Sequence, residues 1–495
     1  MNDTNNNKKK LGLTRVQFIT SLLITFVVGI VGTYAVISMT ANPSAEPVTE
    51  ETSELETEID MQTLFGTADE LAVVNQLYTI LKTSYFEEID SDILVEGALE
   101  GMAGAVGDPY TEYLDEIEST SFEEDISGSF EGIGAEVMKD GEFVRIVSPI
   151  ANSPAEAAGL QPNDFIVEVD GQSVVDMTLN EAVALIRGPE GSDVELLIER
   201  GDNRMTVVLT RATIPIETVY YEVDEQEPTI GYVNIVNFNL PTYEETVTAI
   251  QDLEEQGIEK IVFDVRGNPG GLLTTAIQLA NIFVPNGEPL MMTEYREDEE
   301  PTVYTASDDY GEFKYEGEAI LLINEGSASA SEILAGAMRS VGIPLYGQTT
   351  FGKGTVQSVV SLGDSDEVKF TSGRWLTAEG DWINEDGITP DREVALPDYA
   401  SLFVINPTEV YEQGQNSQEI NNLKNVLSAL GYSLSDNDEY DETVVEAVSS
   451  YQGENDLTVD GIVTDDTARS LTDSLRALIE ANDTQYNAAI EAFQN

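Results

Sequence analysis

Near its start, the sequence has a long segment that carries no charge, Val16 to Met39. A helix needs about 20 apolar residues to cross a bilayer, so this run is long enough. It exceeds the ~7–15 residues of a signal-peptide core, which favours an anchor that is not cleaved. Lys8, Lys9, Lys10 and Arg15 precede the run. This basic flank predicts a cytoplasmic N-terminus, with everything after Met39 outside the membrane.

The exterior part is strongly acidic. The formal net charge is −69, and because the first 39 residues contribute +3, the remainder carries −72. Such a chain repels nucleic acid and anionic membrane surfaces, so we expect no nucleic-acid partner. The hydrophobic fraction of 41% is ordinary and predicts folded domains.

The chain has neither His nor Cys. Disulfides, thiolate metal sites, the usual zinc centres and every Ser-His or Cys-His catalytic pair are therefore excluded. We expect no metal site and no cofactor.

A stretch of small polar residues raises a catalytic question. Ser327, Ser329 and Ser331 lie where a helix is expected to begin, and a helix N-terminus favours the negative charge of acyl transfer. Without histidine, the general base for such a serine is a lysine that burial keeps neutral. Lys353 fits because it lies between two glycines in an otherwise uncharged stretch, and Gln357 follows at a distance suited to hold its amine.

An oxyanion needs two backbone donors. The glycine-rich sequence DVRGNPGG, residues 264–271, follows an expected buried strand and precedes an expected helix. We place one donor at Gly270 or Gly271 and the other at Ala330.

Residues 126–212 resemble a PDZ domain. The likeness rests on Gly132–Ala135, on Ser153–Leu160 and on Val169–Gly171. PDZ domains bind an extended peptide as an added strand and receive its carboxylate on loop amides. The resemblance places peptide binding at Phe130, Glu131, Gly132, Ile133 and Gly134.

Residues after Pro407 resemble a small three-helix peptidoglycan-binding domain, through an Ala-Val-Tyr-Gln helix and the sequence VDGIVTDDT. The acidic segment 436–442 lacks the glycine and spacing of a calcium-binding loop, so a solvated turn is the favoured interpretation.

Three motifs in order resemble the C-terminal processing peptidases, also called tail-specific proteases. They lie at 264–271, 327–332 and 351–357. The resemblance assigns the nucleophile to Ser329, the base to Lys353 and its supporting amide to Gln357. It also implies that the PDZ domain gates the active site, with Arg187 coupling peptide binding to activation; a solvent-facing arginine at a helix end is the alternative.

We therefore expect a multidomain α/β (α+β) protein. Its expected parts are a cytoplasmic tail (1–17), a transmembrane anchor (18–39), an acidic stalk (40–62), a helical part of the protease (63–125), a PDZ domain of β-sandwich or barrel-like form (126–212), a Ser-Lys protease core (213–405) and a peptidoglycan-binding-like domain (406–495).

The predicted function is a membrane-anchored exterior serine endopeptidase that recognises protein substrates with exposed apolar C-termini. Peptidoglycan and the membrane are further expected partners, and a homodimer is an assembly to be tested. A non-catalytic wall-anchored PDZ scaffold is the alternative, but it would need neither Ser329 nor Lys353. A penicillin-recognising acyltransferase fits poorly, because its Ser-x-x-Lys motif would require lysine where Glu332 stands.

Overall fold

The computed structural model describes residues 71–494 except 202, 225, 297–299 and 364–365. The chain divides into two compact units, 1–90 and 91–495. In the first unit, the described residues contain helix α3, Ala72–Ser84. The predicted tail, anchor and stalk lie outside the described residues. Among the helices of residues 71–494 that the structure describes, none is long and apolar enough to cross a membrane.

The centre of the second unit is a six-stranded sheet with strand order β10-β11-β12-β15-β16-β19. Its first pair is antiparallel and the others are parallel. The strands are β10 (Val219–Val223), β11 (Ile230–Ile235), β12 (Lys260–Asp264), β15 (Glu318–Ile323), β16 (Leu345–Gly347) and β19 (Arg392–Glu393). The central strands are apolar on both faces, as expected for parallel strands covered by helices on each side.

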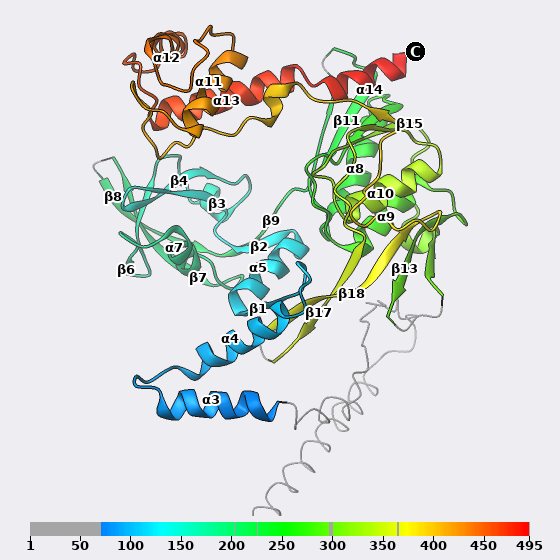
Figure 1. The fold of residues 1–495 in the computed structure, drawn as a ribbon, viewed down its shortest axis with the longest axis horizontal. Coiled ribbons are helices and arrows are strands. Elements are labelled where there is room, and N and C mark those ends of the chain that lie inside the picture. The colour runs from blue at the N-terminus through cyan, green and yellow to red at the C-terminus, as the bar shows by residue number, and fades with distance from the viewer. Residues whose placement is uncertain (1–70, 202, 225, 297–299, 364–365, 495) are drawn as a thin grey trace, which may run out of the picture. The chain divides into compact units, whose positions relative to one another are not determined.

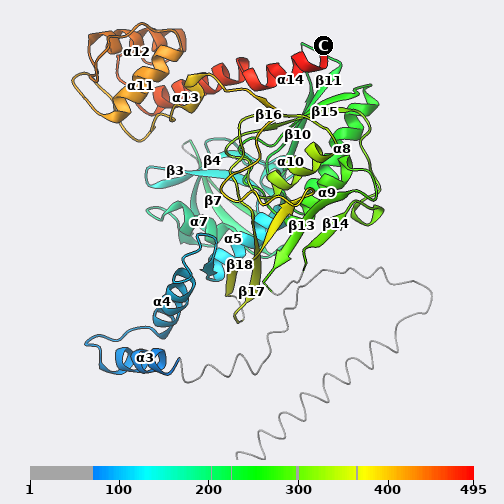
Figure 2. The ribbon, with the colours of Figure 1, turned by 45° about the vertical axis from the view of Figure 1, so that its right-hand side comes forward.

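Helices cover both faces of this sheet (Figures 1 and 2). On one face lie α8 (Thr242–Glu255), α9 (Leu273–Phe283) and α10 (Ala330–Ser340). Alternate residues such as Phe263 and Leu321 enter the core on that side. On the other face lies α14 (Thr484–Gln494), which packs on the intervening residues, such as Val262 and Leu322.

A second, antiparallel sheet flanks the core, with β17 and β18 as its longest hairpin. Its strands are β1 (Glu112–Leu114), β13 (Pro289–Tyr295), β14 (Thr302–Thr305), β17 (Thr355–Ser361) and β18 (Glu367–Thr377). In the sequence, β1 is preceded by helix α4 (Ser91–Gly104) and followed by helix α5 (Glu116–Ser127). Asp115 begins α5 with a capping box, accepting hydrogen bonds from the amides of Ile117 and Glu118.

The PDZ-like part has its own sheet and hydrophobic core. It contains β3 (Ala135–Asp140), β4 (Phe143–Pro149), β5 (Phe165–Val169), β6 (Gln172–Ser173), β7 (Asp193–Arg200) and β8 (Asn203–Thr210), with helices α6 (Pro154–Ala157) and α7 (Leu179–Ile186). Strand β3 lies at the edge of the sheet. A two-stranded ribbon, β2 (Ser129–Gly132) with β9 (Ala212–Pro215), joins the ends of this part.

The last part contains α11 (Gln418–Ala429), α12 (Glu442–Glu454) and α13 (Asp465–Ala481) around a separate core. We predicted that residues 406–495 belong together. Helix α14 falls in that range, yet its contacts are with the protease sheet rather than with this three-helix core. Tyr486 donates to Asp224, and the Lys260 amine donates to the Phe493 carbonyl.

Candidate active site

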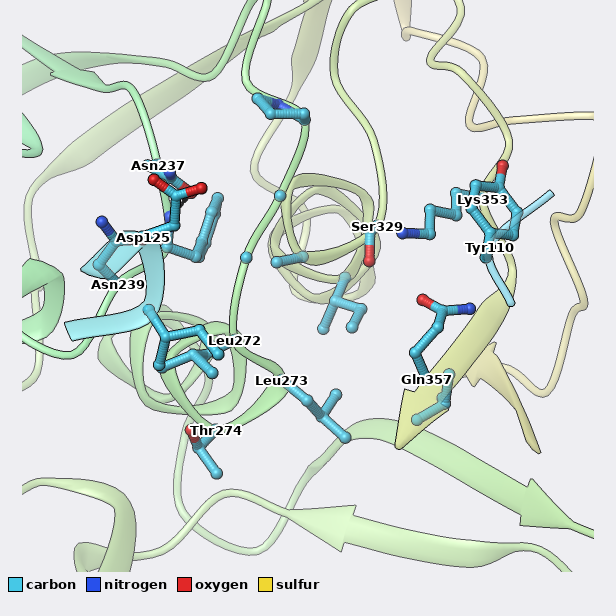
Figure 3. A pocket seen from close by; sticks show the side chains of 18 of the residues that line it. Tyr110, Asp125, Asn237, Asn239, Leu272, Leu273, Thr274, Ser329, Lys353 and Gln357 are labelled. Atoms are coloured by element: carbon cyan, nitrogen blue, oxygen red, sulfur yellow. Dashed lines mark hydrogen bonds between the residues drawn. The ribbon is translucent and has the colours of Figure 1, made fainter. Parts of the chain in front are cut away.

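Ser329 stands immediately before α10, at the end of the turn that follows β15. Its backbone has φ +54° and ψ −111°, a conformation that costs a residue with a side chain about 1–3 kcal/mol and persists only where the surrounding structure holds it. Figure 3 shows its hydroxyl at the helix mouth, facing the side chain of Lys353. The backbone strain thus coincides with the residue assigned as nucleophile.

The two neighbouring serines are structural. The buried Ser327 hydroxyl donates to the Val265 carbonyl, and the buried Ser331 hydroxyl donates to the Asn268 carbonyl. Ser329, rather than Ser331, occupies the N-cap position of α10. The Ser327 and Ser331 hydroxyls attach this segment to the loop that follows β12.

Glu332 holds the segments that carry Ser329 and Lys353 together. Its carboxylate is fully buried, and one oxygen accepts from the amides of both Ser329 and Lys353 at 2.8 Å. The other oxygen accepts from the Thr350 hydroxyl at 2.6 Å and the Gly352 amide at 2.7 Å. Sequence reasoning used Glu332 only to reject a Ser-x-x-Lys motif, because nothing in the sequence indicates its bonds to residues 350–353.

Lys353 comes from the loop between β16 and β17. Gly352 has φ +89°, and a Cβ there would lie 2.9 Å from the Gly387 amide nitrogen, so this position requires glycine. The Trp375 indole donates to the Lys353 carbonyl at 2.8 Å. The amine lies 4.5 Å from the centre of the Tyr110 ring.

The electrostatic surroundings favour a neutral amine on Lys353. Burial lowers its pKa, and the charge of Lys369 lowers it further. The carboxylates of Asp108 and Glu332 act in the opposite direction, but the pKa of Lys353 stays below its ordinary value. A lysine that sheds its proton more readily is what a general base requires.

Gln357 lies on β17, next to the amine (Figure 3). Its side-chain nitrogen donates to the hydroxyl of Thr355 at 2.9 Å and of Thr371 at 3.2 Å. The structure therefore brings the three predicted side chains, Ser329, Lys353 and Gln357, into one pocket.

The glycine-rich loop also lines this pocket. The Gly270 amide already donates to the Asn268 side chain at 2.9 Å. Among the described residues, the amides of Gly271 and Ala330 have no such acceptor. A Cβ on Gly270 would lie 2.9 Å from the Ser329 Cβ, so the loop passes close to the nucleophile.

The pocket has a volume of about 450 Å³. Apolar side chains line much of it, including Phe122 and Ile126 from α5, Leu272 and Leu273 before and in α9, and Trp375 from β18. An extended peptide with apolar side chains suits such a lining. Sequence reasoning did not assign α5 to the site, since the helix is far from the motifs in the chain.

The predicted peptide-binding residues of the PDZ part lie on and just after β2. Residues 130–132 pair with β9, and the Ile133 carbonyl accepts from the Ala155 amide. A Cβ on Gly134 would lie 2.3 Å from the Ser153 side chain, so this position also requires glycine. The free edge available for an added strand is the neighbouring β3.

Arg187 ends α7 and connects the PDZ part with α5. Its guanidinium is paired with the Glu124 carboxylate at 2.5 Å and lies 5.3 Å from the centre of the Phe130 ring. Phe122 and Ile126, on the same helix as Glu124, line the catalytic pocket. The side chain thus touches both a predicted peptide-binding residue and a helix of the active site.

The acidic segment 436–442 forms a helix start. Asp441 caps α12 by accepting from the amides of Thr443 and Val444, and its carboxylate also accepts from Ser435 and Asn437. Within the described part of the chain, no group of three or more acidic side chains could hold a metal ion.

Comparisons with known proteins identify the family and its domains. The model of peptidase family S41 matches residues 229–394, a PDZ domain model matches 145–200, and a peptidoglycan-binding domain model matches 416–471. The model of the N-terminal domain of the activating protease CtpB matches 26–118.

Two curated relatives cover most of the chain. The "Carboxy-terminal processing protease CtpA" of Bacillus subtilis is 42% identical over 424 residues, 85% of this chain and 90% of that protein. A "Probable CtpA-like serine protease" of Staphylococcus saprophyticus is 34% identical over 487 residues, 98% of this chain and 95% of its own. Among solved structures, the photosystem II D1 C-terminal processing protease is 30% identical, with a TM-score of 0.39, covering 67% of this chain and 89% of that one.

The chain belongs to the carboxy-terminal processing serine proteases of peptidase family S41. The resemblance predicted from the three motifs is confirmed, and the protein is a serine-type peptidase with a PDZ domain and a peptidoglycan-binding domain. Its mixed α/β, multidomain fold was also predicted.

Proposed function

We propose that this protease uses a Ser329–Lys353 dyad. We further propose that residues 18–39 anchor it in the cell membrane and that its catalytic domain works on the extracellular side. The observation that carries the dyad is that these two side chains face one another in one pocket (Figure 3), in a chain that has neither His nor Cys. A non-catalytic PDZ scaffold has no need of that arrangement.

In the first half of the reaction, the neutral amine of Lys353 accepts the Ser329 hydroxyl proton while the oxygen attacks the peptide carbonyl carbon. The amides of Gly271 and Ala330 donate to the oxyanion. The carbon–nitrogen bond then breaks, and the Lys353 ammonium gives its proton to the leaving amine. An ester of Ser329 remains.

In the second half, Lys353 accepts a proton from water, whose oxygen attacks the ester carbonyl. The ester bond breaks, and Lys353 returns the proton to the Ser329 oxygen. The products are the resting dyad and a carboxylic acid, which releases its proton to solvent and becomes a carboxylate. The lowered pKa of Lys353 serves both halves, since only its neutral form can begin either one.

The test of the dyad is cleavage of a denatured protein by the full chain in detergent. Ser329→Ala, Lys353→Ala and Lys353→Arg should each abolish cleavage, since arginine does not lose its proton near neutral pH. Ser327→Ala should lose far less. Lys314→Arg is a matched control, because Lys314 also has a pKa lowered by burial but lies outside the pocket. Retention of more than a few per cent of activity by Lys353→Ala would refute the dyad.

We further propose that the PDZ domain selects substrates by their C-terminal ends. A peptide added to the edge of β3 would place its carboxylate near the loop 130–134. Because the surrounding protein is strongly acidic, that carboxylate needs local donors. A substrate with an apolar free C-terminus should be cut faster than the same substrate with a C-terminal amide, and equal rates would remove tail recognition from the proposal.

The cellular proposal has separate tests. A C-terminal tag on the full chain should be labelled by a membrane-impermeant reagent on intact cells, and the protein should stay in the membrane after carbonate extraction. Deleting residues 1–39 should release it. Sedimentation of the full chain with purified peptidoglycan tests wall binding, and light scattering tests for a homodimer.

A further inference from the structure

The turn between α4 and β1, residues 107–111, reaches the catalytic pocket. Its Tyr110 ring lies against the amine of Lys353. Two residues earlier, one carboxylate oxygen of Asp108 accepts from the Thr111 hydroxyl at 2.5 Å and from the Thr371 hydroxyl at 2.6 Å. Sequence reasoning did not assign this stretch to the site, and none of its residues belongs to the three motifs that identify the family.

A chain of hydrogen bonds runs from this turn to the dyad. Thr371 lies on β18 opposite Gln357 on β17. The side-chain nitrogen of Gln357 donates to the same Thr371 oxygen whose proton goes to Asp108. The chain therefore begins at a carboxylate in the turn and ends at the amide beside Lys353.

The direction of every bond in this chain follows from the donor inventory. An ionised carboxylate can only accept, so the Thr371 hydroxyl must give its single proton to Asp108. The hydroxyl oxygen can then only accept, so the group of Gln357 that faces it must be the NH2. The carbonyl oxygen of Gln357 is thereby turned to the other side. Figure 3 shows that oxygen on the side of Ser329 and Lys353.

The charge state of Asp108 supports this direction. Its partial burial acts to raise the pKa, but hydrogen bonds from Thr111 and Thr371 and the charge of Lys353 outweigh that effect. The pKa of Asp108 therefore lies below its ordinary value, and the carboxylate stays ionised wherever Lys353 begins to lose its proton.

We propose that Asp108, acting through Thr371, is a positioning residue that holds the Gln357 amide with its oxygen toward the Lys353 amine. The proposal rests on the Ser-Lys mechanism proposed above. With the amide turned over, its NH2 would face the ammonium that forms when Lys353 accepts the Ser329 proton. Two donors would then face each other at the moment the positive charge develops on Lys353. The variant should therefore lose rate in the chemical step, which is measured as kcat.

The decisive experiment is a double-mutant cycle between Thr371 and Gln357 in the full chain, with kcat and KM measured on one peptide substrate. Thr371→Val keeps the side-chain shape and removes the hydroxyl. It should lower kcat by about tenfold, the effect of one hydrogen bond, with KM changed less than about twofold. Thr371→Ser keeps the hydroxyl and should restore most of the activity.

The second arm shows whether the threonine acts through the glutamine. In a Gln357→Ala background there is no amide to orient, so adding Thr371→Val should change kcat by less than about twofold. Asp108→Ala should reproduce the loss of Thr371→Val, and the two together should be no worse than either alone. Melting temperatures of all variants show whether any has lost its fold.

The opposing results are equally specific. If Thr371→Val lowers kcat by the same factor with and without Gln357, or has no effect in the parental chain, the positioning proposal is overturned. That result leaves the dyad intact, provided that Lys353→Ala is inactive in the same assay. An active Lys353→Ala would instead overturn the proposed mechanism itself.

Discussion

Replacing Glu332 by glutamine tests whether one buried carboxylate sets the geometry of the active site. The carboxylate accepts four hydrogen bonds, including those from the amides of Ser329 and Lys353. Glutamine has nearly the same shape, but its NH2 must replace one of the two accepting oxygens. At least one buried N–H group then loses its acceptor.

The expected loss in the free energy of unfolding follows from the less costly of the two orientations of the new amide. Its NH2 would face Thr350, whose hydroxyl can accept, and the Gly352 amide would remain unpaired at about 1–3 kcal/mol. The two bonds to the remaining oxygen change from a charged to a neutral acceptor, at about 1 kcal/mol each. The sum is about 3–5 kcal/mol. At about 2–4 °C for each kcal/mol, the core should melt roughly 6–20 °C lower.

The assay is calorimetric melting together with cleavage of a protein substrate. Glu325→Gln is the matched control, because Glu325 is exposed on the turn that precedes α10 and the charge change is identical. It should shift the melting temperature by less than about 2 °C. Cleavage by Glu332→Gln should fall even well below its melting temperature, since both reacting segments lose a shared anchor. A shift as small as that of the control, with full activity, would refute the reasoning.

Three further predictions concern charges around the dyad. Lys369→Gln removes a positive charge that lowers the pKa of Lys353, so that pKa should rise and the acid limb of the pH–rate profile should move to higher pH. Lys369→Arg keeps the charge and should leave the limb in place. An acid limb that stays unmoved in both variants would contradict this role of Lys369. Arg187→Ala and Glu124→Gln should each lower kcat several-fold, while titration calorimetry should show that peptide binding to the PDZ domain is largely kept. Full turnover by either variant would show that α5 does not couple the PDZ domain to the active site. Tyr110→Leu should lower kcat more than Tyr110→Phe, because the ring stabilises the ammonium formed during reaction; equal rates would show that the ring has no such role.

The meeting of Ser329, Lys353 and Gln357 in one pocket could be predicted because these residues lie in short motifs. Without histidine and cysteine, few bases remain for a serine, and Lys353 stands out in an uncharged stretch. Element patterns were also informative: the strand expected before residues 264–271 is β12, and the helix expected after them is α9. In these segments local periodicity and turn residues agree with the tertiary structure.

The supporting groups could not be predicted, because they depend on contacts between distant parts of the chain. Asp108 meets Thr371 across 263 positions, and neither residue type indicates the other. Glu332 looks like an ordinary helix start until the loop at 350–353 folds onto it. The Gly270 amide resembled an oxyanion donor, but the side chain of Asn268 takes it up.

The path of the chain also joins the last helix to the catalytic loop. The three helices α11 to α13 lie in the sequence between β19 and α14, and both flanking elements belong to the protease sheet or pack on it.

At the start of α14, Asp483 pairs with Arg266 at 2.7 Å, and the buried Gln485 accepts from the same guanidinium. Arg266 also pairs with Asp264, at the end of β12, and lies two residues before Asn268, which holds the Gly270 amide. The protease core is therefore completed only by residues that follow the peptidoglycan-binding domain, and this domain is held by the core at both of its ends. Such an arrangement makes α14 part of the unit that forms the pocket, because Arg266, in the glycine-rich loop, is held in part by Asp483 and Gln485 at the start of this helix.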